Sequence, residues 1–288
     1  MERAYKLGVV VVGLLPLPLA RALGSSAGWL AWLWADKRKH NAIRAMARVR
    51  GEDPDRPSPE AISSARRLFA GYGRYWAEVF WLRPGRVARV HASTTAEGLE
   101  YFRAALAEGK GVILALPHCG NWEVAGPVAK AEQAELIAVA EQLGSEEITT
   151  WFVALRASLA IDIVLADGTS NVMRALLAGL KRNAAIALLS DRDLSGKGEV
   201  VEFFGERTAL PTGAVRLAKA TGAPILPVGS FFSKTGHAIV VDPPLLVGPD
   251  ESLNDATQRL AAALEVVIRR HPEQWHMVQP NWPSDLIT

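Results

Sequence analysis

VILALPHCGNWE, at residues 112–123, is the stretch that decides the fold. Its first five residues are all apolar, which is typical of a strand buried on both faces of a parallel sheet. Pro117 ends this strand, Gly120 permits a tight turn, and Asn121 is a residue type that favours the start of a helix. His118 is therefore expected at the carboxyl end of a strand, where α/β sheets bind their ligands.

Strands and helices alternate along most of the chain. Short apolar runs predict strands at residues 112–116, 136–140, 161–165, 185–189, 224–228 and 238–241. Helical patterns lie between them at residues 96–108, 122–132, 145–159, 169–181 and 211–221, with a last helix at 254–270. A long helix is expected to begin at Pro59 and to end before Pro84. This order predicts an α/β fold, with helices flanking a largely parallel central sheet.

His118 and Glu123 are the first candidates for chemistry. Their spacing alone is weak evidence, because His237 and Asp242 share it. The second pair falls in a predicted strand, where positions an odd number apart face opposite sides, so it is predicted to be inert. Glu123 instead falls in the first turn of a helix, from which its carboxylate can turn back onto the His118 imidazole. We therefore predict a general base, His118, oriented by an acid, Glu123.

Composition sets the broad class of the protein. A chain of 288 residues is long enough for one large domain with an appendage. Cys119 is its single cysteine and is interpreted as a small buried side chain, so no intramolecular disulfide is expected. No spacing of His and Cys indicates a metal site, and no phosphate loop or dinucleotide fingerprint is present.

Positive charge is concentrated at the start of the chain. Residues 1–90 carry 16 Lys and Arg against 7 Asp and Glu, a balance of +9, so the remainder has a balance of −7. Such a segment predicts an anionic partner, either nucleic acid or lipid. The adjacent apolar runs favour an anionic membrane surface over nucleic acid.

Residues 1–50 are predicted to attach the protein to a membrane surface. The run Leu7–Ala20 has 14 residues and two prolines, which is short of the roughly 20 that a spanning helix needs. A second apolar run, Ala27–Ala35, contains three tryptophans, as in segments that lie in the membrane interface. Ordinary core helices and a cleaved secretory signal remain alternatives. The basic residues that follow the second run are Lys37, Arg38, Lys39, Arg44, Arg48 and Arg50.

The stretch Pro117–Glu123 resembles the catalytic motif of the superfamily of lysophospholipid and lipid A acyltransferases. It is most similar to the branch that contains bacterial lipid A acyltransferases and mycobacterial phosphatidylinositol mannoside acyltransferases. Four further blocks resemble this branch in order and spacing, and the resemblance covers residues 5 to 285. These blocks are WAE at 76–78, SDRDL at 190–194, VEFFGE at 201–206 and LPTGA at 210–214.

The resemblance implies roles for individual residues. His118 would deprotonate a sugar hydroxyl that attacks an acyl thioester, and Glu123 or Glu202 would be its acidic partner. Asn121, Arg156 or backbone N–H groups would stabilise the oxyanion. Arg192 and Arg207 would bind phosphates of coenzyme A or of the acceptor. The alternatives are a surface ion pair for Arg192, between Asp191 and Asp193, and a solvated strand position for Glu202.

The resemblance predicts a membrane-associated O-acyltransferase that moves a fatty acyl group from acyl-CoA to a sugar hydroxyl of a phosphatidylinositol mannoside-like glycolipid. It implies an acyltransferase domain at residues 51–288, no permanently bound cofactor and no metal. A monomer on the cytoplasmic face of the inner membrane, binding anionic lipid and no nucleic acid, is the expected form. Two alternatives remain: a lipid A-type enzyme that uses acyl carrier protein as donor, and a non-catalytic membrane-binding protein.

Overall fold

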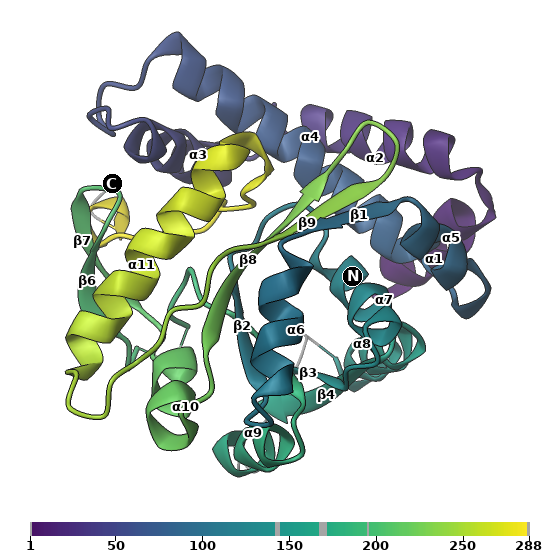
Figure 1. Cartoon of the computed structure of the whole chain (residues 1–288). Coiled ribbons are helices and arrows are strands. Elements are labelled where there is room, and N and C mark those ends of the chain that lie inside the picture. The colour runs from purple at the N-terminus through teal and green to yellow at the C-terminus, as the bar shows by residue number, and fades with distance from the viewer. Residues whose placement is uncertain (1, 142–144, 167–171, 195, 287–288) are drawn as a thin grey trace.

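A seven-stranded, mostly parallel sheet forms the centre of the computed structural model, which describes residues 2–141, 145–166, 172–194 and 196–286 (Figure 1). The strand order is β1-β9-β8-β2-β5-β3-β4, and neighbouring strands are parallel except for β8 and β9. The expected largely parallel sheet is confirmed. Its strands are β1 Thr94–Glu97, β2 Val112–Leu116, β3 Leu136–Glu141, β4 Ile161–Ala166, β5 Ala185–Leu189, β8 Ile225–Phe232 and β9 His237–Val241.

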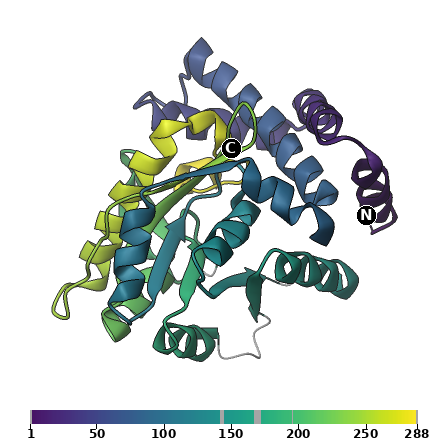
Figure 2. The same cartoon turned by 45° about the vertical axis from the view of Figure 1, so that its right-hand side comes forward.

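Helices cover both faces of this sheet (Figures 1 and 2). In β2, Val112, Leu114 and Leu116 belong to the apolar cluster that includes α6, α7 and α8, whereas Ile113 and Ala115 belong to the cluster with α9, α10 and α11. All five side chains are buried, which explains the unbroken apolar run of the sequence. These helices are α6 Leu99–Ala107, α7 Ala125–Ala131, α8 Glu146–Ser158, α9 Val172–Lys181, α10 Gly213–Thr221 and α11 Leu253–Arg270.

Three short strands are additional to the prediction. β1 lies at the edge of the main sheet, and β6 Glu199–Phe203 and β7 Glu206–Leu210 form a separate antiparallel hairpin. Phe204 and Gly205 join the hairpin strands with positive φ angles of 52° and 77°. Two consecutive residues of this kind are typical of a tight hairpin turn. The predicted helix at 169–181 begins outside the described residues and is observed from Val172 onward.

The N-terminal part of the chain forms helices. α1 Glu2–Leu14 and α2 Leu17–Ala31 meet at Pro16, and α2 packs closely on α4 Pro59–Trp81. A Cβ atom added at Gly28 would lie 2.0 Å from the backbone oxygen of Phe69, so only glycine permits this approach. Among the described residues, no helix has both the length and the apolar content that a membrane crossing requires.

Apolar side chains are concentrated on the surface of α1, α2 and the turn after α2. Among the described residues, nine of the sixteen exposed large apolar side chains lie between positions 10 and 34. This distribution departs from that of an ordinary surface, where such side chains are scattered singly. The nine are Val10, Val11, Leu14, Leu19, Leu23, Trp29, Leu30, Leu33 and Trp34.

α3, Asp36–Val49, corrects one part of the prediction for residues 1–50. Arg44 and Arg48 were expected to face anionic lipid, but their side chains are only 3% and 2% exposed. Both pair with Asp285 near the C-terminus, and Arg48 also pairs with Glu206. Burial between carboxylates removes these two arginines from any lipid surface. Lys37 and Arg38, at the start of α3, are exposed.

Candidate active site

His118 and Asp191 meet at the carboxyl ends of two neighbouring parallel strands. β2 and β5 end in register, with Leu116 opposite Leu189, and each is followed two residues later by one of these side chains. The Nδ1 atom of His118 lies 2.7 Å from Oδ1 of Asp191, and the backbone N–H of His118 donates to Oδ2 at 3.0 Å. The sheet therefore holds an imidazole and a carboxylate in one fixed orientation.

Asp191 is a fully buried carboxylate with several donors. The indole Nε1–H of Trp275 donates to its Oδ2 at 2.7 Å, in addition to the two contacts from His118. Burial by itself raises the pKa of Asp191, but the positive charge available on His118 and the hydrogen bonds from His118 and Trp275 outweigh it, and the pKa is held below its usual value. Asp191 is consequently ionised at neutral pH.

The segment 274–276 clamps the loop that carries His118. The backbone N–H of His276 donates to the carbonyl of His118 at 2.8 Å, and the N–H of Gly120 donates to the carbonyl of Gln274 at 2.9 Å. His276 also donates from Nε2 to the carbonyl of Gly120 at 2.9 Å, because a carbonyl can only accept. Burial is the main reason why the pKa of His276 falls to about 4, so its ring is neutral.

The His118 ring leaves its second nitrogen available for chemistry. Its side chain is 29% exposed, and one edge meets Trp122 in a T-shaped contact at 5.4 Å between ring centroids. Since Asp191 accepts from Nδ1, the unprotonated Nε2 can take a proton from a bound hydroxyl. Cys119, next to it, is fully buried, and burial raises the pKa of its thiol well above the usual value, as expected for a packing residue.

Glu123 does not hold His118, which corrects the predicted pairing. Its carboxylate accepts from Arg156, from Nε at 3.0 Å and from Nη2 at 2.8 Å, and from the Tyr75 hydroxyl at 3.3 Å. Glu123 is 1% exposed, so this bidentate contact neutralises a charge that has been removed from water. The short 3-10 turn Trp122–Val124 turns the carboxylate away from the imidazole and toward α8.

Asn121 fixes the loop after His118 instead of facing a ligand. Its Oδ1 accepts from the N–H of Glu123 at 3.2 Å, which confirms the predicted capping role. Its Nδ2 donates to Glu78 at 2.8 Å, and its side chain is buried, so it is not placed to donate to an oxyanion. Ser230 donates to the Asn121 carbonyl at 2.7 Å. The loop is thus held from both sides.

Glu78, from α4, is the acceptor at the centre of a buried polar cluster. Arg21 of α2 and Arg74 donate to its Oε1 at 2.7 and 2.9 Å, and His237 lies 2.7 Å from its Oε2. Burial raises the pKa of Glu78, but the hydrogen bond and charge of His237 and the charges of the two arginines lower it to about 2. His237 therefore has a structural partner that is unrelated to Asp242.

A narrow apolar cavity lies beside the His118 loop. Its volume is about 50 Å³, and its walls come from Trp122, from α8, from the carboxyl ends of β2 and β5, and from β3 and the start of β4. Glu123 and Arg156 are the charged residues that line it, and the remainder of the lining is apolar. The Arg156 guanidinium and the Glu123 carboxylate thus pair with each other at the wall of this cavity.

Glu202, Arg207 and Arg192 lie outside this cluster of contacts. Glu202 and Arg207 are exposed and stand opposite each other across the β6–β7 hairpin. Strand alternation turns Phe203 into the core and Glu202 outward, so the expectation that Glu202 adjoins His118 is corrected in favour of Asp191. Arg192 is half-buried next to Asp191, which belongs to the site and not to a surface ion pair.

Four functional candidates were missed by sequence reasoning: Asp191, Trp275, His276 and Glu78. Asp191 had a usable signal, because it follows the strand 185–189 by the same two residues that separate His118 from the strand 112–116. Trp275 and His276 had none, since they reach the site from more than 150 residues away. Glu78 was noted only as part of the block 76–78.

The fold and this site define the class of the protein. Residues 3–284 match the family of the bacterial lipid A biosynthesis acyltransferases, and the chain belongs to this family. It is an acyltransferase of the lipid A and phosphatidylinositol mannoside type.

Individual relatives narrow the comparison. The chain is 37% identical over 249 residues to the phosphatidylinositol mannoside acyltransferases of two strains of Mycobacterium tuberculosis, which covers 84% of this chain and 76% of each relative. It is 36% identical over 247 residues to the phosphatidylinositol mannoside acyltransferase of Mycolicibacterium smegmatis, covering 84% of this chain and 79% of that relative.

Proposed function

We propose that this protein transfers a fatty acyl group from acyl-CoA to a sugar hydroxyl of a phosphatidylinositol mannoside-like glycolipid. His118 is the general base in this proposal, and Asp191 takes the role of its acidic partner. The observation that carries the proposal is the pair itself: an imidazole, 29% exposed, held at 2.7 Å by a buried carboxylate at the carboxyl end of the sheet. A base of this kind serves acyl transfer to a hydroxyl.

The proposed reaction is a direct transfer. Nε2 of His118 takes the proton of the sugar hydroxyl while the hydroxyl oxygen attacks the thioester carbonyl carbon. The C–S bond of the tetrahedral intermediate then breaks, and the departing thiolate of coenzyme A takes the proton from His118. Asp191 keeps Nδ1 protonated throughout and stabilises the imidazolium that forms between the two steps.

Arg156 is the proposed electrostatic partner of the developing oxyanion. It lines the apolar cavity beside His118, where a positive charge acts through less water than at the surface. Glu123, which lines the same cavity, holds the guanidinium in place. Arg192, half-buried next to Asp191, and the exposed Arg207 remain proposals for contacts with the phosphates of the donor or of the acceptor.

Peripheral binding at the cytoplasmic face of the inner membrane is the second part of the proposal. The exposed apolar side chains between positions 10 and 34 support this proposal, because they would enter the headgroup region of the membrane while the central sheet stays outside it. Lys37 and Arg38 supply exposed positive charge next to this surface. The acceptor would then reach His118 without leaving its bilayer.

Free thiol release tests the enzymatic proposal. Purified protein is incubated with palmitoyl-CoA, with and without phosphatidylinositol mannoside, and compared with the variant His118→Ala. We expect acceptor-dependent thiol release from the wild type and at most a trace from the variant. Equal release by the two proteins would contradict the proposal.

The competing proposal is the lipid A-type reaction, and it is supported by the match to the family of the bacterial lipid A biosynthesis acyltransferases. The same assay with palmitoyl-acyl carrier protein as donor, and with lipid A precursors as acceptor, separates the two. Faster transfer from the carrier protein to a lipid A precursor would replace the first proposal by the second. Retention of the His118 requirement would still identify the site.

A further inference from the structure

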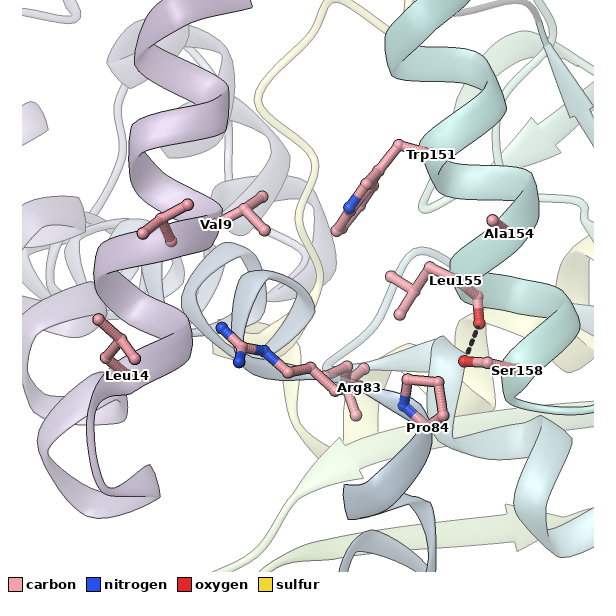
Figure 3. Close-up of a pocket in the computed structure, with 10 residues that line it drawn as sticks. Val9, Leu14, Arg83, Pro84, Trp151, Ala154, Leu155 and Ser158 are labelled. Carbon is pink, nitrogen blue, oxygen red and sulfur yellow. Dashed lines mark hydrogen bonds between the residues drawn. The ribbon is translucent and has the colours of Figure 1, made fainter.

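A groove between α1 and α8 lies away from His118 (Figure 3). Its volume is about 480 Å³, within the roughly 300–1,000 Å³ that is usual for ligand sites. α1 and α8 form opposite walls, and the connection after α4 closes one end. The lining residues are Val9, Val10, Leu14, Leu82, Arg83, Pro84, Trp151, Ala154, Leu155 and Ser158.

The walls of this groove are apolar and remain open to solvent. Val10 and Leu14 are 56% and 74% exposed, although both are apolar and lie on the wall that α1 contributes. On α8, Trp151, Ala154 and Leu155 share one face of the helix, since they are three and four residues apart. Apolar walls that face each other across open space lack the partner that would bury them.

An uncompensated cluster of positive charge adjoins the groove. Arg83 is its single charged lining residue, and Arg86 and Arg89 follow on the next turns. Arg86 donates to the carbonyls of Trp81 and Gly13 at 2.8 Å, and none of the three arginines pairs with a carboxylate among the residues that the structure describes. Burial is the largest cause that lowers the pKa of Arg86, and the neighbouring charges of Arg83 and Arg89 lower it further. Such a cluster attracts a phosphate.

An aromatic row connects the groove to the candidate active site. Each ring contacts the next, with centroid distances between 4.3 and 6.1 Å. Phe152 and Tyr75 are only 4% and 3% exposed, so the row passes through the core and joins the groove to the site by packing, not by an open surface. The members of the row, in order, are Trp151, Phe152, Trp76, Tyr75, Trp122 and His118.

We propose that the groove between α1 and α8 binds one acyl tail of the phosphate-bearing acceptor lipid, with its phosphate at Arg83. This inference rests on the proposed function for the identity of the acceptor. It assigns the groove to the acceptor and leaves the cavity beside Trp122 to the donor side of the reaction. Apolar walls bind the tail, and the arginines at one end, which have no carboxylate partner among the described residues, select a lipid with an anionic headgroup.

Filling the groove from α8 tests this proposal, and α8 offers a matched control. Ala154 and Ala157 are both exposed on the same helix, but of the two only Ala154 lines the groove. Ala154→Phe should obstruct the tail, whereas Ala157→Phe carries the same helix-propensity cost at a position that does not line the groove. Transfer from palmitoyl-CoA is measured to intact phosphatidylinositol mannoside and to the same headgroup after removal of its fatty acids.

We expect Ala154→Phe to raise the KM for the intact lipid about tenfold or more, which corresponds to at least ~1.4 kcal/mol of binding. The KM for the deacylated headgroup and that for palmitoyl-CoA should stay at the wild-type values, and Ala157→Phe should resemble the wild type throughout. An equal effect on both acceptors, or an effect on the KM for palmitoyl-CoA, would overturn the assignment to the acceptor tail.

Direct binding keeps this test independent of the proposed reaction. Dioctanoyl phosphatidylinositol, below its micellar concentration, is titrated calorimetrically into the wild type, Ala154→Phe, Ala157→Phe and Arg83→Gln. Weaker binding by Ala154→Phe and Arg83→Gln supports the groove even where no acyl transfer is detected, in which case the proposed function fails and the site stands. Unchanged binding by Ala154→Phe refutes the site.

Discussion

Replacement of Trp275 by phenylalanine should lower the turnover number of the acyl transfer and leave substrate binding unchanged. The Trp275 indole donates to Oδ2 of Asp191 at 2.7 Å, and both side chains are fully buried, so water cannot replace the lost donor. Phenylalanine keeps the apolar ring but removes this N–H. His118 would then be the remaining side chain that orients the carboxylate.

The expected size of this effect follows from the negative charge of Asp191, which accepts the hydrogen bond from Trp275. A hydrogen bond to an ionised group is worth about 1.5–3 kcal/mol. If most of this is lost in holding the His118–Asp191 geometry, kcat falls by roughly 10- to 100-fold, because each ~1.4 kcal/mol of barrier is a factor of ten. The KM values for donor and acceptor should stay within about twofold, since the indole faces Asp191 and not the open side of His118.

Trp282 supplies the matched control. It is also a buried tryptophan, 6.3 Å from Trp275 between ring centroids, and its indole donates to the neutral carbonyl of Phe203 at 3.1 Å. Trp282→Phe should therefore destabilise the fold by a similar cavity term without changing kcat. Steady-state kinetics are measured on both variants after near-UV circular dichroism shows native packing. Equal loss of kcat in both variants, or wild-type kcat in Trp275→Phe, would refute the reasoning.

Four further substitutions separate the candidate residues. Asp191→Asn should lower kcat by roughly 10³- to 10⁴-fold, because the amide no longer fixes the imidazole tautomer, whereas Glu202→Gln should stay within about twofold in the same thiol-release assay. Glu78→Gln should lower the free energy of unfolding in urea by about 3–5 kcal/mol, because buried cations lose their carboxylate. The pKa of His276 is about 4 in the folded protein against 6.5 in the unfolded chain. The stability that its neutral ring contributes is therefore fully present above pH 6.5 and is lost as the pH falls toward 4. Between pH 7 and 5, protonation of His276 should therefore lower the free energy of unfolding by about 2 kcal/mol, and the variant His276→Gln should lose correspondingly less over the same range. The same pH dependence of the unfolding free energy in both proteins would contradict this assignment.

The central sheet was predictable because its strands are buried on both faces. β2 has no exposed residue, so its five apolar residues in a row carry the signal without any knowledge of neighbours. β1, β6 and β7 were missed for the opposite reason: each has only four or five residues, and polar side chains occupy their outward positions except at Val200 of β6. A short, half-exposed strand resembles a loop in sequence.

The acidic partner of His118 was mispredicted because the sequence does not state which strands are neighbours. Glu123 is close in sequence, and the prediction used this proximity. In the structure β5 lies next to β2, which brings Asp191 to His118 across 73 positions, while the turn at Trp122 directs Glu123 to Arg156. Strand order is a property of the whole sheet, so no local motif could supply it.

The helix that the sequence assigned to the membrane segment also takes part in the architecture of the site. Arg44 and Arg48 of α3 both bind Asp285, whose other oxygen accepts the backbone N–H of Asn281 at 3.1 Å. Asn281 in turn donates from its side chain to the backbone carbonyl of Asp191 at 3.1 Å. A series of contacts therefore runs from the first third of the chain, through its last residues, to the carboxylate that orients His118. Because each member is polar and largely removed from water, loss of one leaves the next without its partner, and the geometry of the base depends on the N-terminal and C-terminal segments folding together.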